Sequence, residues 1–193
     1  MQISNKQQAI IEVSGKILME KGILGLTTKN LALEMNFSES ALYRHFKNKE
    51  EIILLLIRYL SNNINERFEN IINSDINPEE KYIQLFKSQF AFFNKNPHFI
   101  AIVLSDGLMD NSKEIKNEVQ KLIQINAICY KKVIVRGQNS NIFNNEVDAD
   151  DLVHFAMGTF RLQMLKWKLS NFSFDIETQG MKTMTNLLTL LKK

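Results

Sequence analysis

Residues 27–49 of this 193-residue chain hold the polar and basic side chains whose types and spacing point most clearly to chemistry. Short side chains at Ser40 and Ala41 allow close approach to the edges of DNA bases, and Ala41 can touch a thymine methyl group. Glu39 can accept a hydrogen bond from a cytosine amino group, and Arg44 can pair with guanine. The segment therefore predicts a surface that enters the major groove of double-stranded DNA.

Two short helices joined by a tight turn are predicted to position these side chains. Thr27 is suited to cap the first helix, because its hydroxyl can accept a hydrogen bond from a free N–H of the first turn. Asn36 tolerates a positive φ better than most residues and can therefore make the tight turn. Ser38 is suited to cap the second helix, which would lie in the groove.

The remaining sequence also favours helices, because its two prolines and seven glycines fall where helices start or stop. A helix over residues 6–20 should end at Gly22 in the left-handed conformation. Asn48 and Glu51 resemble a capping box for a long helix that reaches about residue 71. Later helices are predicted near residues 78–94, 97–109, 112–136, 148–170 and 174–191, with caps at Asn77, Asn96, Asp148 and Ser173. The chain is therefore predicted to be all-α, with about nine helices and no strand.

The formal excess of positive charge lies in the first quarter of the chain. Residues 1–49 contain seven Lys or Arg and four acidic residues, whereas the rest contains 17 of each kind. This asymmetry favours a polyanion-binding N-terminal part on a neutral body. The longest aliphatic run, residues 52–57, is far shorter than the roughly 18 residues of a membrane span. With a single cysteine and no secretory signal pattern, a cytoplasmic protein that does not bind membranes is expected.

Residues 27–49 resemble the DNA-binding head of TetR-family (TetR/AcrR-like) transcriptional regulators. The family pattern is Thr, three residues, Ile/Leu-Ala, a turn glycine, Val-Ser, three residues and Leu-Tyr-x-His-Phe-x-x-Lys. This chain has Asn36 in place of the glycine and Phe37, expected as a bulkier core plug, in place of the valine. The resemblance implies a three-helix helix-turn-helix DNA-binding domain over residues 1–48 and an effector-binding and dimerisation domain over residues 49–193.

The resemblance also implies a function and a set of DNA-binding residues. A bacterial repressor that binds a palindromic operator as a homodimer and is released by a small apolar ligand is expected. Tyr43, His45 and Lys49 match family positions that grip phosphates, and Thr28 and Lys29 can reach the backbone or a base. The full set of expected DNA contacts is Thr27, Thr28, Lys29, Ser38, Glu39, Ser40, Ala41, Tyr43, Arg44, His45 and Lys49.

The body is rich in aromatic residues, with eleven of the thirteen phenylalanines beyond residue 49. Relatives enclose an apolar effector pocket between their middle helices, and the alternative for each aromatic residue is ordinary core packing. The candidate effector contacts are Phe90, Phe93, Met109, Cys129, Met157 and Phe160.

Two apolar stripes near the C-terminus suggest a partner surface. TetR-like proteins dimerise by packing their last two long helices against the same pair of a second copy, which would present two heads to the operator. The alternative is packing within one chain. One stripe contains Leu152, Val153, Ala156, Phe160, Met164 and Trp167, and the other contains Met181, Met184, Leu187, Leu188 and Leu191.

The sequence offers no recognisable carrier of catalysis, so no enzyme activity, cofactor or metal is expected. It contains no phosphate-binding glycine loop, Cys-x-x-Cys pair, His-Glu-x-x-His helix or nucleophile elbow. Asp148, Asp150 and Asp151, followed by His154, are interpreted as acids at a helix N-terminus rather than as a metal site. Cys129 is expected to be a buried thiol, and His98 to be exposed or capping.

A second interpretation comes from the nucleoid-occlusion branch of the same family. Residues 38–47 and the Asn96-Pro97 pair are similar to that branch, whose members bind DNA and a cell-division polymer. In that case the body would dock a protein instead of a small ligand.

Overall fold

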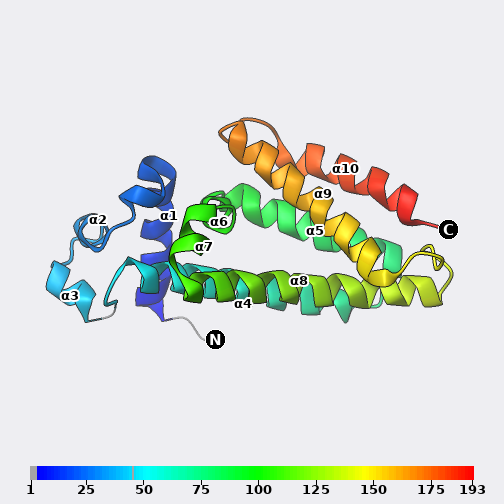
Figure 1. The fold of residues 1–193 in the computed structure, drawn as a ribbon, viewed down its shortest axis with the longest axis horizontal. Coiled ribbons are helices and arrows are strands. Elements are labelled where there is room, and N and C mark those ends of the chain that lie inside the picture. Colours follow the sequence, from blue (N-terminus) through cyan, green and yellow to red (C-terminus); the bar gives the residue numbers. More distant parts are fainter. Residues whose placement is uncertain (1–3, 45) are drawn as a thin grey trace. The chain divides into compact units, whose positions relative to one another are not determined.

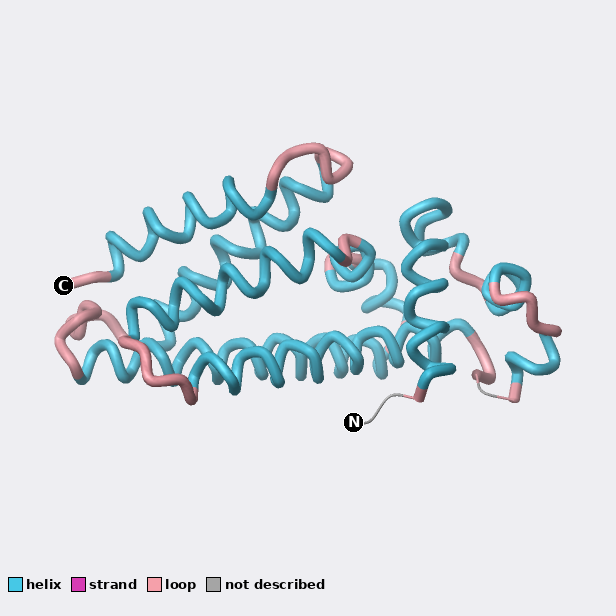
Figure 2. Tube along the Cα trace, turned by 180° about the vertical axis from the view of Figure 1, so that it is seen from behind, coloured by secondary structure: helices cyan, strands magenta, loops and turns pink. Residues whose placement is uncertain are grey.

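The computed structural model describes residues 4–44 and 46–193, and these residues form ten helices (Figures 1 and 2). The helices are α1 (Asn5–Gly25), α2 (Thr28–Glu34), α3 (Glu39–Tyr43), α4 (Lys49–Ile72), α5 (Pro78–Lys95), α6 (His98–Val103), α7 (Asp106–Asn111), α8 (Lys113–Asn139), α9 (Ala149–Leu169) and α10 (Ile176–Leu191). Across these residues there is no strand, only an isolated bridge between Phe143 and Lys192. The predicted all-α class is confirmed. None of the described helices is both long and apolar enough to span a membrane.

The tenth helix arises because the helix predicted over residues 97–109 is two helices. The chain leaves helical geometry at Leu104, with φ −102° and ψ 26°, and is extended at Ser105, with ψ 99°. Ser105, Asp106 and Gly107 follow this break and are residue types that favour caps and turns, so the sequence carries a local signal that the prediction of a single helix missed. The short helices α6 and α7 result.

Five of the ten described helices, α2, α3, α4, α5 and α9, begin at predicted caps. The side-chain oxygens of four caps accept a hydrogen bond from a first-turn N–H, namely Thr27 from Asn30 at 3.1 Å, Ser38 from Ala41 at 3.2 Å, Asn77 from Glu80 at 2.9 Å and Asp148 from Asp150 at 2.7 Å. The predicted positive φ at Asn36 is confirmed at 54°. These groups satisfy N–H donors that a helix start otherwise leaves without a partner.

Two predicted caps and one predicted capping box differ from the structure. The cap of α10 is Asp175, which accepts from the N–H of Thr178, and not Ser173. Pro97, and not Asn96, precedes α6, without a side-chain capping bond. Asn48 accepts from the N–H of Glu51 as predicted, but the Glu51 carboxylate accepts from the N–H of Lys47 rather than from that of Asn48.

Gly22 kinks α1 near its end. Its φ of 64° and ψ of −171° lie in a region that residues with a Cβ avoid. Beyond the kink, the chain adds one turn that reaches Gly25 instead of ending. The predicted stop is therefore a kink that redirects the end of α1.

The helices form two compact units. The first unit comprises Met1–Asn62 and Asn96–Leu122. Within it α1 packs against α2 and α6, and α2 packs against α3. A Cβ added to Gly15 would lie 2.8 Å from the ring of His98, so α1 and α6 approach closely at a position where only glycine fits. His98 was expected to be exposed or a cap, and it is neither.

The second unit comprises Asn63–Lys95 and Ile123–Lys193 and has an aromatic core. The rings of Phe86 and Tyr130 stack with centroids 4.6 Å apart, and Phe90 lies 5.1 Å from Phe160. Helix α10 packs against α5 and α9, where a Cβ on Gly180 would meet the Phe90 ring at 2.5 Å. Ring packing of this kind buries large apolar areas and fixes the helices in register.

Candidate functional site

The short helices α2 and α3 of the first unit bring predicted DNA-binding residues together. The hydroxyls of Thr28, at the start of α2, and Tyr43, at the end of α3, lie 3.1 Å apart in a hydrogen bond. The Tyr43 side chain is 49% exposed, so its ring and hydroxyl are open to solvent. These two phosphate-contact candidates, 15 residues apart in sequence, thus form one polar patch.

The start of α3 is held by its own hydroxyl groups. The Ser38 side chain caps α3 and also forms a hydrogen bond of 3.0 Å with the Ser40 hydroxyl. Glu39 is exposed in the first turn, where its charge complements the helix dipole, and Ala41 is half-buried. The groups expected to meet bases therefore line the start of an exposed helix, and Leu42 holds the same helix to the core with no exposed surface.

Arg44 and Lys29 are exposed at opposite ends of the motif. Arg44 occupies the C-cap position of α3, and Lys29 lies in the first turn of α2. Thr27 uses its hydroxyl to cap α2 and is half-buried. His45, the remaining phosphate-contact candidate of this segment, lies outside the described residues.

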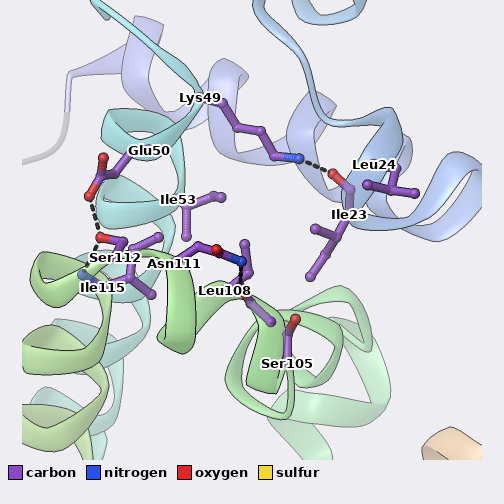
Figure 3. A pocket seen from close by; sticks show the side chains of 11 residues that line it. Ile23, Leu24, Lys49, Glu50, Ile53, Ser105, Leu108, Asn111, Ser112 and Ile115 are labelled. Atoms are coloured by element: carbon purple, nitrogen blue, oxygen red, sulfur yellow. Dashed lines mark hydrogen bonds between the residues drawn. The ribbon is translucent and has the colours of Figure 1, made fainter.

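Lys49 is placed differently from the other candidates. It is half-buried at the first position of α4, and its ammonium group donates a hydrogen bond to the backbone carbonyl of Ile23 (Figure 3). Burial lowers the pKa of Lys49 below its usual value. The bond to Ile23 uses one of the three donors of this ammonium and draws it toward α1, so a DNA phosphate could be met only by the remaining donors or after this bond opens.

Phe37 is not the core plug expected from its position. Its side chain is 37% exposed, and the Lys6 ammonium stands 5.3 Å from the ring centroid in a cation–π contact. The fully buried apolar residues of α2 and α3 are Leu31 and Leu42 instead. The larger ring therefore remains at the surface of the turn.

A carboxylate organises the basic residues of α1. Glu34 accepts from Lys16 at 3.0 Å and lies 3.6 Å from the Lys21 ammonium. The hydrogen bond from Lys16 lowers the pKa of Glu34, with smaller contributions from the charges of both lysines. These two cations are therefore engaged with α2, whereas Lys29 and Arg44 extend from the motif itself.

The six candidate effector residues do not form one group. Phe90 and Phe93 of α5 meet Phe160 of α9, with ring centroids 5.1 and 6.1 Å apart. Cys129 is buried in the same unit, where burial raises the pKa of its thiol, and Met157 is half-buried on α9. Met109 belongs to α7 of the first unit, whereas the other five candidate residues belong to the second unit.

A polar cluster around Arg67, whose guanidinium lies 4.9 Å from the centroid of the Phe92 ring, was missed by sequence reasoning. The Arg67 guanidinium donates to Asn63 at 2.8 Å, to Ser88 and to Gln89 at 3.1 Å, and Gln89 donates to Asn126 at 2.8 Å. Burial lowers the pKa of Arg67 to about 10. Only the Asn63–Arg67 pair has helical spacing, so the sequence gives no signal for the rest.

The predicted C-terminal stripe of α9 faces its own chain. Leu152, Val153, Ala156, Met164 and Trp167 are buried, Phe160 is half-buried, and the indole N–H of Trp167 donates to the carbonyl of Phe174 at 3.0 Å. A different set of apolar side chains on α9 is exposed, comprising Phe155, Leu162, Leu165 and Leu169. Their spacing of seven, three and four residues places them on one helix face. In the second predicted stripe, Met184, Leu188 and Leu191 of α10 are buried, whereas Met181 and Leu187 are half-buried.

The acidic start of α9 serves structural roles in the described chain. Asp148 caps the helix, and Asp150 pairs with Lys131 at 2.7 Å. His154 is exposed, and its ring lies 6.5 Å from that of Phe155. These contacts follow the preference of helix N-termini for acids.

Two protein families match the chain over adjacent segments. The family described as bacterial regulatory proteins, tetR family, matches residues 10–56. The family described as YsiA-like protein, C-terminal region, matches residues 58–190, which is more than half of the chain. The first match contains α2, α3 and the turn between them.

Individual proteins are similar to the chain at lower identity. The nucleoid occlusion factor SlmA of Shewanella sp. (strain W3-18-1) is 27% identical over 160 residues, which cover 80% of each chain. The fatty acid degradation regulator FadR of Bacillus halodurans has a TM-score of 0.86 at 15% identity, covering 97% of both chains. FadR of Bacillus subtilis in complex with stearoyl-CoA has a TM-score of 0.81 at 16% identity and covers 94% of this chain and 97% of its own. At such identities, the two solved structures establish the fold.

Proposed function

The chain belongs to the TetR family of bacterial regulatory proteins and is a DNA-binding regulator, and on this premise we propose that it represses transcription as a homodimer on a palindromic operator. DNA is bound by the N-terminal domain, residues 1–48, with α3 in the major groove. Residues 49–193 bind the effector and the second copy. The single observation that carries this proposal is the patch in which Thr28 of α2 pairs with Tyr43 at the end of the exposed helix α3.

Contacts divide between phosphates and bases in this proposal. The Thr28–Tyr43 pair and Lys29 hold the DNA backbone on either side of the groove. Glu39, Ser40 and Arg44 read base edges, because they are exposed on or beside α3. A helix-turn-helix dimer reads two half-sites one helical turn, or a multiple of it, apart.

The second copy covers the exposed apolar face of α9. The side chains of Phe155, Leu162 and Leu169 are between 50% and 74% exposed. Contact of such an apolar face with water is unfavourable, and a second copy that covers the face removes this contact. A two-fold axis beside α9 and α10 buries the same residues on both copies. Leu162→Glu is expected to shift the protein from dimer to monomer in analytical ultracentrifugation, whereas Leu33→Glu, at an exposed leucine of α2, leaves the dimer intact. A dimer that survives Leu162→Glu contradicts this placement.

The effector enters the second unit among Phe90, Phe93 and Phe160. Rings from α5 and α9 supply the apolar surface that such ligands bury. Helix α4 is continuous from Lys49 to Ile72, so it can pass a displacement toward the DNA-binding helices. Because FadR of Bacillus subtilis forms a complex with stearoyl-CoA, this compound is a suitable first probe. It is expected to weaken operator binding, and unchanged binding at a saturating concentration would contradict the effector assignment.

Nucleoid occlusion is the second candidate function, favoured by the similarity to SlmA over 80% of each chain. The two functions differ in their distribution of DNA sites. We propose selecting fragments of the encoding genome with the purified protein at a stated salt concentration. Enrichment of one palindrome beside a few genes supports the repressor, whereas many dispersed sites together with an effect on division-protein assembly support the alternative. Recovery of no sequence above background contradicts both.

A further inference from the structure

The first unit contains a cavity of about 470 Å³ that the proposed effector site does not use and that shares only Lys49 with the expected DNA contacts. Its lining comes from the end of α1, the start of α4, the short helix α7 and the start of α8 (Figure 3). The volume lies in the range of roughly 300–1,000 Å³ that small-molecule sites occupy. The eleven lining residues are Ile23, Leu24, Lys49, Glu50, Ile53, Ser105, Gly107, Leu108, Asn111, Ser112 and Ile115.

One wall of the cavity is apolar. The aliphatic side chains of Ile23, Ile53 and Leu108 come from three different helices and converge below Lys49 in the view of Figure 3. Ile115 adds a buried aliphatic group at the first turns of α8. This surface suits a short hydrocarbon chain, which gains free energy by leaving water.

Lys49 supplies a cation at the edge of that wall. Its ammonium donates to the neutral carbonyl of Ile23, and no carboxylate pairs with it among the described residues. It also stands at the N-terminus of α4, where the helix dipole disfavours a positive charge. A half-buried cation without a counter-ion is stabilised by an anion, and an ammonium group has three donors for it.

The acidic residue of the lining does not neutralise Lys49. The Glu50 carboxylate accepts a hydrogen bond from the Ser112 hydroxyl, and that hydroxyl in turn accepts from the N–H of Ile115. In Figure 3, the Glu50 side chain points toward Ser112 and the Lys49 side chain toward Ile23, in different directions. The Glu50 carboxylate therefore bonds to Ser112 at the start of α8 and does not form an ion pair with Lys49.

We propose that this cavity binds a small amphipathic carboxylate, with the acid group on Lys49 and the hydrocarbon chain against Ile53, Leu108 and Ile115. The bound acid takes the place of the Ile23 carbonyl on the ammonium group. It thereby occupies a lysine that is otherwise a candidate phosphate contact. Because the site is tested on the free protein, its failure would not affect the proposed DNA binding or the effector site of the second unit.

Gly107 allows the cavity to be filled without strain. A Cβ at this position meets no atom within 4 Å, and the backbone has no positive φ that would penalise a side chain. Because Gly107 belongs to the lining, Gly107→Phe is expected to place a ring at the cavity, whereas Gly107→Ala adds only a methyl group. Both substitutions are favourable for a helix, so both variants are expected to fold.

The test is a calorimetric titration of the full chain with octanoate. A parallel titration with octan-1-ol, a neutral compound of equal chain length, serves as the comparison. The wild type and Gly107→Ala should bind octanoate, and Gly107→Phe should not. Lys49→Met should weaken octanoate binding about tenfold or more, because it removes a charge-assisted hydrogen bond. Lys47→Met, at the exposed neighbouring lysine, should leave it unchanged.

Three results would overturn the proposal. Octanoate that binds no better than octan-1-ol would show that the Lys49 charge is not used. Equal affinity of Gly107→Phe and Gly107→Ala would place any bound octanoate elsewhere, including the second unit. Equal losses of octanoate affinity in Lys49→Met and Lys47→Met would show that only the net charge of the protein matters, and not the position of Lys49. Circular dichroism melting curves of the four variants separate these results from misfolding.

Discussion

The DNA-binding helices and the second unit are stabilised by different means. In α2 and α3, side chains such as Thr27 and Ser38 satisfy backbone donors, and the buried apolar residues are Leu31, Ala32 and Leu42, without any ring. In the second unit, rings such as Phe86 and Phe90 are fully buried and stack on other rings. The comparison teaches that the first region depends on local polar geometry in addition to a few buried aliphatic side chains, whereas the second depends chiefly on the volume of its buried rings.

The largest expected effect comes from removing a buried ring of the second unit. Phe90→Ala should lower the free energy of unfolding by about 3–5 kcal/mol, because it leaves a cavity between α5, α9 and α10. Phe37→Ala, at the exposed ring of the turn, should cost no more than about 1 kcal/mol. Urea unfolding of both variants measures this difference. Equal losses would contradict the contrast between the two regions.

The close packing of α1 against α6 predicts a dependence of stability on pH. Burial lowers the pKa of His98 to about 4 from an ordinary value of 6.5, so the folded chain holds this ring neutral. Between pH 4 and pH 6.5 the unfolded chain binds more protons at His98 than the folded chain does. The free energy of unfolding therefore decreases as the pH falls from 6.5 toward 4. The loss should approach about 3 kcal/mol.

His98→Leu isolates this contribution from that of other titrating groups. The variant keeps an apolar side chain against Gly15 and Phe99 but cannot be protonated. Urea unfolding between pH 4 and 7 should therefore show a flatter pH dependence for His98→Leu than for the wild type. Parallel curves would mean that His98 is solvated in solution.

The tight turn between α2 and α3 gives a smaller effect of backbone origin. Asn36 has a φ of 54°, which a β-branched residue adopts poorly. Asn36→Val should therefore cost about 1–2 kcal/mol, and Asn36→Gly should be neutral or stabilising. Thermal melting of the two variants tests the sign of each change, and a neutral valine variant would refute the requirement for positive φ.

The smallest expected effect is loss of one cap. Ser38→Ala should cost about 1 kcal/mol, because the N–H of Ala41 loses its partner at the start of α3. Ser173 is a matched control, since it was predicted as a cap but Asp175 fills that role. Ser173→Ala should change stability by less than about 0.5 kcal/mol. If the two alanine variants melt alike, capping does not stabilise α3.

Local features of the fold could be predicted, and contacts between distant residues could not. Thr27, Asn36 and Ser38 act through bonds or backbone angles within a few residues, which the sequence displays directly. The bond from Lys49 to Ile23 spans 26 residues and depends on how α1 meets α4, so spacing alone gives no hint of it.

The faces of α9 illustrate a second limit. Both faces of this helix carry apolar residues, and periodicity finds each stripe without telling which one packs inside. The buried face contains the predicted stripe, and the exposed face contains Phe155 and Leu162. Only the position of α10 against α9 decides between them.

The central claim is that α3 and its flanking residues read a specific DNA sequence. The most direct measurement is the affinity of wild type, Arg44→Ala and Lys29→Ala for a fragment selected by the protein and for the same fragment scrambled, across a series of salt concentrations. Arg44→Ala should lose about 1–3 kcal/mol on the selected fragment and much less on the scrambled one, whereas Lys29→Ala should weaken both alike and flatten the salt dependence. Equal losses on both fragments for Arg44→Ala, or none, would contradict the account.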